Sequence, residues 1–323
     1  MRALESVQNQ DLYDLQIVVV CRDVAPGVHH SLEVAAGRDI HIDLIDVEDS
    51  ARGACLKAGF AATRGLQIVA MNADEWFAPQ SLSKMVDVAC EAAADMVIPT
   101  ASLDRYDAHR ERHSRVLDAT SLAIDDRASL AAGLPQMISG GLIAQTSGVM
   151  YSRSLFETCL SSDRALRSIG FMTCALSQAQ RIFGCGGACF HAVAPRLTDA
   201  FDPTLFAKLT DDARALDELT DSLVEAGGDT QLKVASHMFY FAGLVACIEN
   251  LCLSPHGVSS IERSARMRDM LEASRTRQMA AALKGNHRGL GLLFGPIASA
   301  KPARCVMYTH LAAFFNRTGV KTA

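Results

Sequence analysis

The chain has 323 residues, a net charge of −5 and 49% apolar residues, which is an ordinary balance for a globular protein. This length allows one large domain or a domain with a substantial appendage. An acidic chain lacks the basic face that a nucleic-acid backbone requires, so nucleic acid is excluded as the main partner.

The cysteines and the apolar segments bear on location. The ten cysteines mostly stand singly among apolar residues, and the first residues carry no apolar stretch of the signal-peptide kind. We therefore expect a reducing compartment and a cytoplasmic protein, either free or peripheral at a membrane. The most apolar long segment, 234–253, contains His237, Glu249 and Asn250. Such groups are costly inside a bilayer, so a buried helix is predicted here and no transmembrane segment is expected.

In chain order, the first hundred residues alternate between strand and helix patterns. A β-branched run at 15–20 predicts a parallel strand that is buried on both faces. Further strands are predicted at 40–45, 67–71 and 95–99, with helices at 27–37, 50–65 and 79–93. The alternation predicts an α/β domain with a mostly parallel sheet flanked by helices.

Beyond residue 100 this alternation ends. Polar residues dominate to 128, and the arginines and histidines between 105 and 115 are interpreted as a solvated loop. A strand running into a helix is predicted at 147–160, a helix at 171–183 and a short strand at 188–193. Helices are then predicted at 203–226, 230–253, 259–284 and 303–317. The chain thus divides into an α/β domain, 1–200, and a helical C-terminal region, 201–323.

Polar residues follow two of the predicted strands directly, as Cys21–Asp23 and as Asn72–Glu75. In open α/β sheets ligands bind beyond the carboxyl ends of the strands, so a site is expected at these tips. Two carboxylates at one tip suit a hard metal ion, which in turn would bind a phosphate. The alternative interpretation is a solvated turn in which Asp74 caps the helix that begins near Pro79.

The segment "LESVQNQDLYDLQIVVV" resembles the family-2 glycosyltransferases of the GT-A fold, in which a helix ending in Ser-Val-x-x-Gln leads into a strand. "KAGFAATRGLQIVAMNADEWFAPQSLSKMV" is similar to the family's strand, acidic tip, proline and helix, and "ADMVIP" and "SGVMYSRSLFE" also have counterparts. The resemblance covers roughly 3–200 and rests most on 57–99. It implies transfer of a sugar from a nucleotide-diphosphate donor to a glycan or envelope polysaccharide.

The resemblance also implies roles for the tip of the third predicted strand. In this family an acidic tip holds Mg²⁺ or Mn²⁺, which neutralises the donor diphosphate as the nucleotide departs. Carried over position by position, Asn72 takes the first acidic position, Asp74 the second and Glu75 the one after it. Asp74 is then the expected metal ligand and Glu75 assists. Weak metal binding is expected because Asn72 offers only a neutral oxygen.

At the tip of the first predicted strand the family carries paired aspartates, one of which contacts the nucleotide base. Here those positions hold Cys21 and Arg22, and Asp23 follows one position late. Arg22 could contact a phosphate or pair with Asp23 or Asp46 at the same strand ends. The expected nucleotide-binding residues are Cys21, Arg22, Asp23, Asn72 and Asp74.

Two departures from the family bear on activity. The family's first strand would lie before Met1, so an N-terminally truncated domain is expected. The family's general base belongs near 168–170, where this chain has no carboxylate, and the candidate catalytic residue is the earlier Asp163. A lost general base slows a reaction by roughly a hundredfold to ten-thousandfold. Two functions are therefore predicted: a family-2 transferase with little activity of its own, or a non-catalytic relative that binds a partner glycosyltransferase or a glycan.

Overall fold

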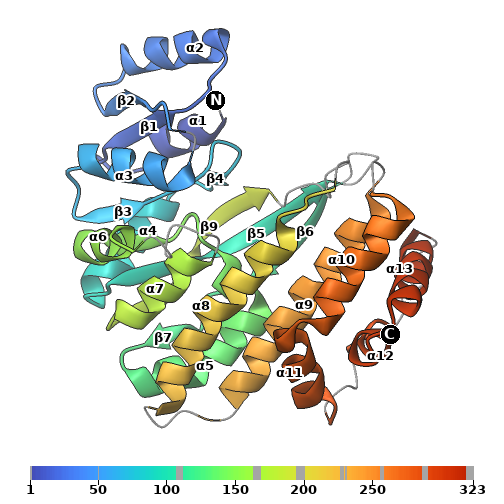
Figure 1. Ribbon diagram of the computed structural model, residues 1–323. Helices are drawn as coiled ribbons and strands as arrows, with labels where there is room; N and C mark the ends of the chain where they lie inside the picture. The colour runs from blue at the N-terminus through green and yellow to red at the C-terminus, as the bar shows by residue number, and fades with distance from the viewer. Residues whose placement is uncertain are drawn as a thin grey trace. The chain divides into compact units, whose positions relative to one another are not determined.

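The computed structural model describes residues 2–49, 51–106, 112–162, 169–193, 201–225, 229, 231–254, 258–285 and 290–317. The chain divides into two compact units, Met1–Ala194 and Pro195–Ala323 (Figure 1). The boundary predicted at residue 200 falls in 194–200, outside the described residues. Each unit is described by itself.

The first unit is a mixed α/β structure. Its elements, in chain order, are α1 (Arg2–Gln8), β1 (Ile17–Cys21), α2 (Pro26–Ala36), β2 (Ile42–Asp46), α3 (Arg52–Ala62), β3 (Gln67–Val69), β4 (Trp76–Phe77), α4 (Ser81–Glu91), β5 (Met96–Tyr106), β6 (Arg112–Leu117), β7 (Ala123–Ile124), α5 (Arg127–Gly140), the 3-10 helix η1 (Leu142–Ala144), β8 (Met150–Ser152), α6 (Arg153–Leu160), α7 (Gly170–Gln178) and β9 (Ile182–Val193). The predicted alternation of strand and helix over the first hundred residues is confirmed.

Strands β1 and β2 form a small parallel sheet of their own. Ile17 lies opposite Ile42, and Cys21 lies opposite Asp46 at the carboxyl ends of both strands. Helix α2 packs on β2, and α3 packs on β1 (Figure 1). The run at 15–20 was expected to be buried on both faces, but the residues of β1 before Cys21 are only half-buried. The reason is that β1 pairs with a single strand in the described part of the chain.

The remaining strands form a seven-stranded sheet in the order β3-β8-β5-β9-β4, with β6 on β5 and β7 on β9. Helix α4 packs against β5 and β9. The centre of this sheet is fully buried at Met96, Ile98 and Phe190. This sheet therefore carries the hydrophobic core of the first unit.

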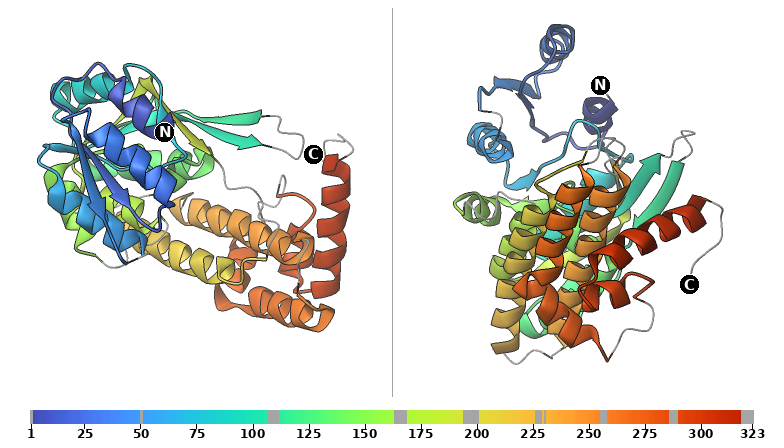
Figure 2. Two further views of the ribbon diagram at one scale, coloured as in Figure 1. Left: turned by 90° about the horizontal axis from the view of Figure 1, so that it is seen from above. Right: turned by 45° about the vertical axis from the view of Figure 1, so that its right-hand side comes forward.

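The prediction of a mostly parallel sheet is wrong for the seven-stranded sheet, although the α/β class with a helical C-terminal region is confirmed. Only the β5–β9 pair is parallel there, and the other five pairings are antiparallel. The antiparallel strands come mainly from residues after 100, where strand and helix no longer alternate. The prediction of a loop at 105–115 is also wrong at both ends of this range, because β5 continues to Tyr106 and β6 begins at Arg112. Strands β5 and β6 form a hairpin there, visible in Figure 2, and residues 107–111 lie outside the described part.

The second unit is helical, as predicted. Its elements are α8 (Leu205–Glu225), α9 (Gln231–Leu253), α10 (Ser260–Glu272), α11 (Ser274–Leu283), α12 (Phe294–Ala298) and α13 (Pro302–Arg317). The single helix expected at 259–284 is broken at Ala273, whose ψ of 138° is extended. A hydrophobic core joins these helices, with Tyr240 and Leu244 of α9 fully buried in it.

Helix α9 is the one described helix that is long and apolar enough to cross a membrane, judged by length and composition alone. Two of its hydroxyl groups form hydrogen bonds inside the unit: the Tyr240 hydroxyl lies 2.9 Å from Thr276 Oγ1, and Ser236 donates to Asp217 at 2.6 Å. These contacts and its buried apolar residues are those of a core helix, as the sequence predicts.

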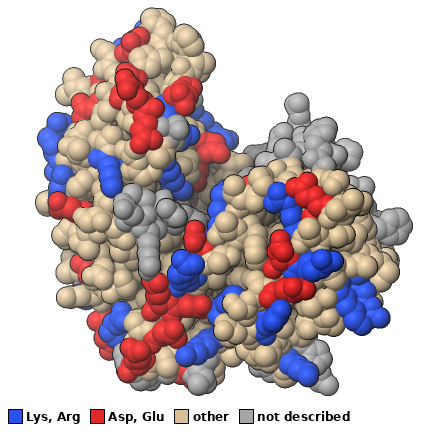
Figure 3. All heavy atoms as spheres, viewed as in Figure 1, with Lys and Arg blue, Asp and Glu red and all other residues tan. Residues whose placement is uncertain are grey.

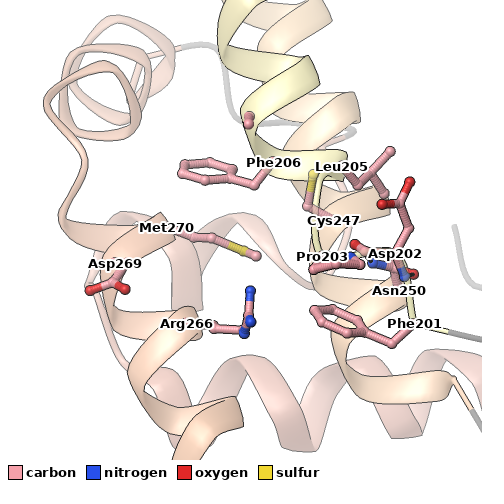
Figure 4. Close-up of a pocket in the computed structure, with 11 residues that line it drawn as sticks. Phe201, Asp202, Pro203, Leu205, Phe206, Cys247, Asn250, Arg266, Asp269 and Met270 are labelled. Carbon is pink, nitrogen blue, oxygen red and sulfur yellow. Dashed lines mark hydrogen bonds between the residues drawn. The ribbon is translucent and has the colours of Figure 1, made fainter. Parts of the chain in front are cut away.

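The second unit also holds a small pocket of about 190 Å³ (Figure 4). Its walls are mostly apolar, and Arg266 reaches into it with its guanidinium over the ring of Phe201, 5.1 Å from the centroid. Arg266 also pairs with Glu262 at 2.9 Å. The guanidinium of Arg266 is therefore already engaged by the protein.

Candidate functional site

The tip of β3 is a polar turn held together by one buried carboxylate. The backbone N–H of Asn72 donates to Glu75 Oε2 at 2.6 Å, and the hydroxyl of Ser147 donates to Glu75 Oε1 at 2.7 Å. Glu75 is only 7% exposed. Both carboxylate oxygens of Glu75 therefore accept hydrogen bonds that stabilise the turn.

Asn72 and Asp74 differ from Glu75 because both are exposed at this tip. The backbone carbonyl of Asp74 accepts a hydrogen bond from the guanidinium of Arg2 at 3.4 Å. The side chains of Asn72 and Asp74 therefore present oxygen atoms to solvent from a turn whose shape Glu75 maintains. Two such donors suit a hard cation that keeps part of its water shell.

An aromatic and basic stack covers the strand that follows this tip. Trp76 on β4 stacks on His191 of β9, with ring centroids 4.7 Å apart and planes 4° from parallel. The guanidinium of Arg2 also lies over the Trp76 ring, 3.4 Å from the ring centroid. This stack lies at β4, an edge strand of the seven-stranded sheet.

His191 also connects to a buried carboxylate that the sequence analysis missed. Its Nδ1 lies 3.7 Å from Oδ2 of Asp104, a residue with no exposed surface. Ser102 and Ser114 donate hydrogen bonds to Asp104 Oδ1 at 2.9 and 2.6 Å. Burial and the nearby Asp104 raise the pKa of the Cys189 thiol, whose sulfur lies 3.6 Å from His191 Nε2. No sequence signal marked Asp104, because the strand predicted at 95–99 was expected to end before it, whereas β5 continues to Tyr106.

The tip of β1 carries the other predicted nucleotide-binding residues. Cys21 is 3% exposed, and burial together with Asp46 raises the pKa of its thiol. A buried Cys21 cannot offer its side chain to a nucleotide in this conformation. Arg22 and Asp23 are exposed beyond the strand, and Asp23 adopts the left-handed region with φ of 49°, as a turn residue does.

His29 of α2 also contacts this tip, and no sequence pattern predicts that contact. Its Nε2 lies 3.0 Å from Asp46 Oδ1. Asp46 was considered only as a partner for Arg22. A histidine on the following helix gives no signal at this distance in sequence, since the contact depends on how α2 returns over β2.

The predicted site residues are therefore gathered in two places. Asn72, Asp74 and Glu75 share the turn after β3, in the seven-stranded sheet, whereas Cys21–Asp23 lie at the end of β1, in the two-stranded sheet. The candidate base Asp163 lies outside the described residues. Helix α7 begins at Gly170, close to the expected position of the base, and its sequence carries no carboxylate.

Acidic and basic side chains are interspersed on the face drawn in Figure 3. Such mixing accords with a net charge of only −5. It offers no broad basic surface on that face.

Comparison with known proteins gives the same family. Residues 1–158 match the model of glycosyl transferase family 2. Among solved structures, the chain is similar to residues 1–349 of S. aureus TarS, with a TM-score of 0.59 and 12% identity, covering 98% of this chain and 87% of that one. The same TarS region in complex with UDP-GlcNAc gives a TM-score of 0.61 at 12% identity, covering 99% and 88%.

Full-length S. aureus TarS is matched with a TM-score of 0.57 and 10% identity, over 96% of this chain and 52% of that one. Among curated proteins a sequence search finds no match. At such low identities the structural likeness shows the fold, which is that of the GT-A glycosyltransferases. Residues 1–158 form a domain of glycosyl transferase family 2.

Proposed function

We propose that the first unit binds a nucleotide-diphosphate sugar beyond the carboxyl ends of its strands and transfers the sugar to a glycan, such as an envelope polysaccharide. The observation that carries this proposal is the family match over 1–158, which includes the exposed Asp74 at the tip of β3. The similar TarS domain has been crystallised with UDP-GlcNAc. UDP-linked sugars are accordingly the first donors to test.

The residues at the tip of β3 have distinct proposed roles. Asp74 binds the divalent ion, Mg²⁺ or Mn²⁺, and Asn72 contributes a neutral oxygen. Glu75 assists by holding the turn through Asn72 and Ser147. When bound, such an ion compensates the charge of the departing nucleotide diphosphate. With a single exposed carboxylate at this tip, the affinity for the ion is low.

The tip of β1 has a smaller part in this proposal. Arg22 and Asp23 are exposed and can reach a nucleotide, while the buried Cys21 shapes the strand end behind them. A cytoplasmic location, free or peripheral at a membrane, is proposed on the ten cysteines, which are all free thiols in the structure.

A second candidate function is a non-catalytic relative that binds a nucleotide sugar, a glycan or a partner glycosyltransferase. The specific observation in its favour is helix α7, whose residues from Gly170 to Gln178 include no carboxylate where the family places its base. Transfer without a base is slower by roughly two to four orders of magnitude. We therefore propose that turnover by this chain is slow.

One experiment separates the two functions. Binding of UDP-, GDP- and CDP-linked sugars is measured by calorimetry with Mn²⁺, and donor hydrolysis and transfer are assayed on the same protein. Binding with turnover supports the transferase, binding without turnover supports a non-catalytic relative that keeps the nucleotide-sugar site, and absence of binding refutes the transferase. Asp74→Ala should weaken Mn²⁺-dependent binding, whereas Asp87→Ala, which removes an exposed carboxylate on α4, should not.

A further inference from the structure

Three side chains from three different elements meet at the end of the two-stranded sheet. Cys21 is the last residue of β1, Asp46 is the last residue of β2, and His29 lies on α2. Cys21 and Asp46 are partners in the parallel register, so their side chains project from the same side of the sheet. One sulfur, one nitrogen and one oxygen of the three lie within 4.8 Å of one another. In the described part of the chain this is the only group of three such side chains close enough to share an ion.

The chemistry of these three atoms selects among metals. A thiolate and an imidazole favour zinc-like ions, while Mg²⁺ and Ca²⁺ prefer sites made of oxygen alone. A tetrahedral zinc ion with bonds of about 2.0–2.3 Å holds its ligands about 3.5 Å apart. His29 Nε2 and Asp46 Oδ1 stand at 3.0 Å, close to that spacing. Small side-chain movements would bring all three atoms to an ion.

A fourth side chain supports His29 from behind. Glu33, one helical turn along α2, places its Oε1 3.4 Å from Nδ1 of His29. Zinc-binding histidines ordinarily donate their second ring nitrogen to a carboxylate in this way, which sets the tautomer and the ring orientation. Here the arrangement leaves Nε2 directed at Asp46. Glu33 thus holds His29 in an orientation in which its Nε2 can bind an ion together with Cys21 and Asp46.

The exposure of the three residues provides a route for an ion. Cys21 is 3% exposed at the base of the group, the side chain of His29 is 29% exposed, and that of Asp46 is 73% exposed. The carboxylate stands at the mouth and the thiol lies at the bottom. A fourth coordination position is left for water or another ligand from the solvent side.

We propose that Cys21, His29 and Asp46 form a binding site for one zinc-class divalent ion, with Glu33 positioning His29. The thiol proton leaves to the solvent as the metal–sulfur bond forms. The ion ties β1, β2 and α2 together at the end of a sheet that has only two strands. This site is distinct from the turn at Asp74, and it does not depend on the proposed sugar-transfer function.

Cobalt is the probe for this site, because thiolate coordination has a characteristic absorption. The full chain, first stripped with a chelator, is titrated with Co²⁺. We expect one equivalent to produce thiolate-to-cobalt charge-transfer absorption in the near ultraviolet and the visible bands of a tetrahedral site. Zn²⁺ should abolish both signals. Failure of the wild-type protein to develop the charge-transfer absorption would overturn the proposal.

Variants identify the ligands. His29→Gln should weaken Co²⁺ binding by roughly a hundredfold or more, and Glu33→Gln by roughly tenfold to a hundredfold. His30→Gln is the matched control, because His30 lies next on α2 and also approaches Glu33, at 3.5 Å, but belongs to no such group. Equal binding by the wild type and His29→Gln would refute the assignment.

The thiol needs its own test because the chain has ten cysteines. Cys21→Ser should remove the charge-transfer absorption, while Cys55→Ser, at a thiol outside the group, should keep it. Circular dichroism checks that both variants fold. Charge-transfer absorption that survives in a folded Cys21→Ser protein would place the ion on another thiol and contradict the proposal.

Discussion

The two sheets of the first unit bury similar residues to very different depths. The valines of β1 are half-buried, whereas Met96, Val97 and Ile98 of β5 have at most 1% exposure. Strand β5 lies between neighbours on both edges and under α4, while β1 has β2 on one edge and α3 on a face. An apolar run in a sequence indicates that a strand is suited to burial, but the number of its neighbours decides how deeply it is buried.

The largest expected difference in stability is between alanine substitutions at two glycines. Gly184 lies on β9 of the seven-stranded sheet, and Gly59 lies on α3, which packs on β1 of the two-stranded sheet. A Cβ at Gly184, on β9, would overlap the backbone carbonyl of Ala119. Backbone cannot yield as a side chain can, so we expect Gly184→Ala to lower the free energy of unfolding by about 3 kcal/mol or more. A Cβ at Gly59, on α3, would lie 3.1 Å from a methyl group of Val20. There the gain in helix propensity, up to about 1 kcal/mol, offsets the crowding, so Gly59→Ala should be nearly neutral.

Urea unfolding followed by tryptophan fluorescence measures both variants. Trp76 is the only tryptophan and lies on β4, so its signal reports on the first unit. Equal unfolding midpoints for Gly184→Ala and the wild type would show that the seven-stranded sheet can expand at this point. The contrast between the sheets would then be smaller than the structure indicates.

A matched pair of valines tests the same contrast by removing atoms. Val97→Ala deletes two methyl groups from a position that is 1% exposed. We expect it to cost roughly 2–3 kcal/mol, from lost burial and from the cavity that remains. Val19→Ala makes the same deletion in the half-buried β1 and should cost about 1 kcal/mol. Urea midpoints give both values, and a larger cost at Val19 than at Val97 would contradict the comparison.

The sequence was informative where local pattern decides structure and uninformative where distant partners decide it. The strands at 15–20, 40–45 and 67–71 and the helices after 203 follow from periodicity and from glycine and proline positions. The pairing of β5 with β9 joins residues about 90 apart, and nothing in either segment specifies a parallel partner. The strand tips were located correctly, since polar residues after an apolar run mark a chain leaving the core.

The chemistry at those tips depended on such distant contacts as well. Glu75 is fixed by Ser147, which lies 72 residues later in the chain. His29 reaches Asp46 only because α2 packs back on β2. Sequence reasoning could name the acids at the strand ends, but it could not tell which were exposed and which were already engaged.

The tip of β3 provides a test of that distinction between an engaged and an exposed acid. Glu75→Gln keeps the size of the side chain but replaces one of two accepting oxygens with a donor. Either Asn72 N–H or the Ser147 hydroxyl then loses a charge-assisted acceptor, so we expect a cost of about 1–2 kcal/mol. Asp74→Asn, at an exposed position one residue away, should change stability by less than about 0.5 kcal/mol. Similar costs for the two variants would mean that the turn does not depend on Glu75.

The smallest expected effect concerns the connection between α1 and the two-stranded sheet. Helix α1 packs on β4 of the seven-stranded sheet, and at its end Gln8 donates to Asp39, in the segment between α2 and β2, at 2.8 Å. This hydrogen bond, with further ones from the backbone and ring of His41, lowers the pKa of the Asp39 carboxyl to about 2. Because the carboxylate form is the one that accepts these bonds, their contribution to stability is present above the ordinary carboxyl pKa of about 3.9. It is lost as the pH falls through about 2.

Carboxyl titration by NMR measures this connection directly. We expect Gln8→Ala to raise the pKa of Asp39 toward its ordinary value, since the largest of the stabilising hydrogen bonds is removed. Asp126 is the internal control: its pKa is lowered by Ser129 at the start of α5, so it should titrate identically in both proteins. The Asp39 side chain is 23% exposed and lies at the surface, where solvent screens its interactions, so the unfolding midpoint at neutral pH should move little. If the Asp39 pKa is the same in Gln8→Ala as in the wild type, the hydrogen bond does not form in solution. The two-stranded sheet would then be held to α1 by other contacts.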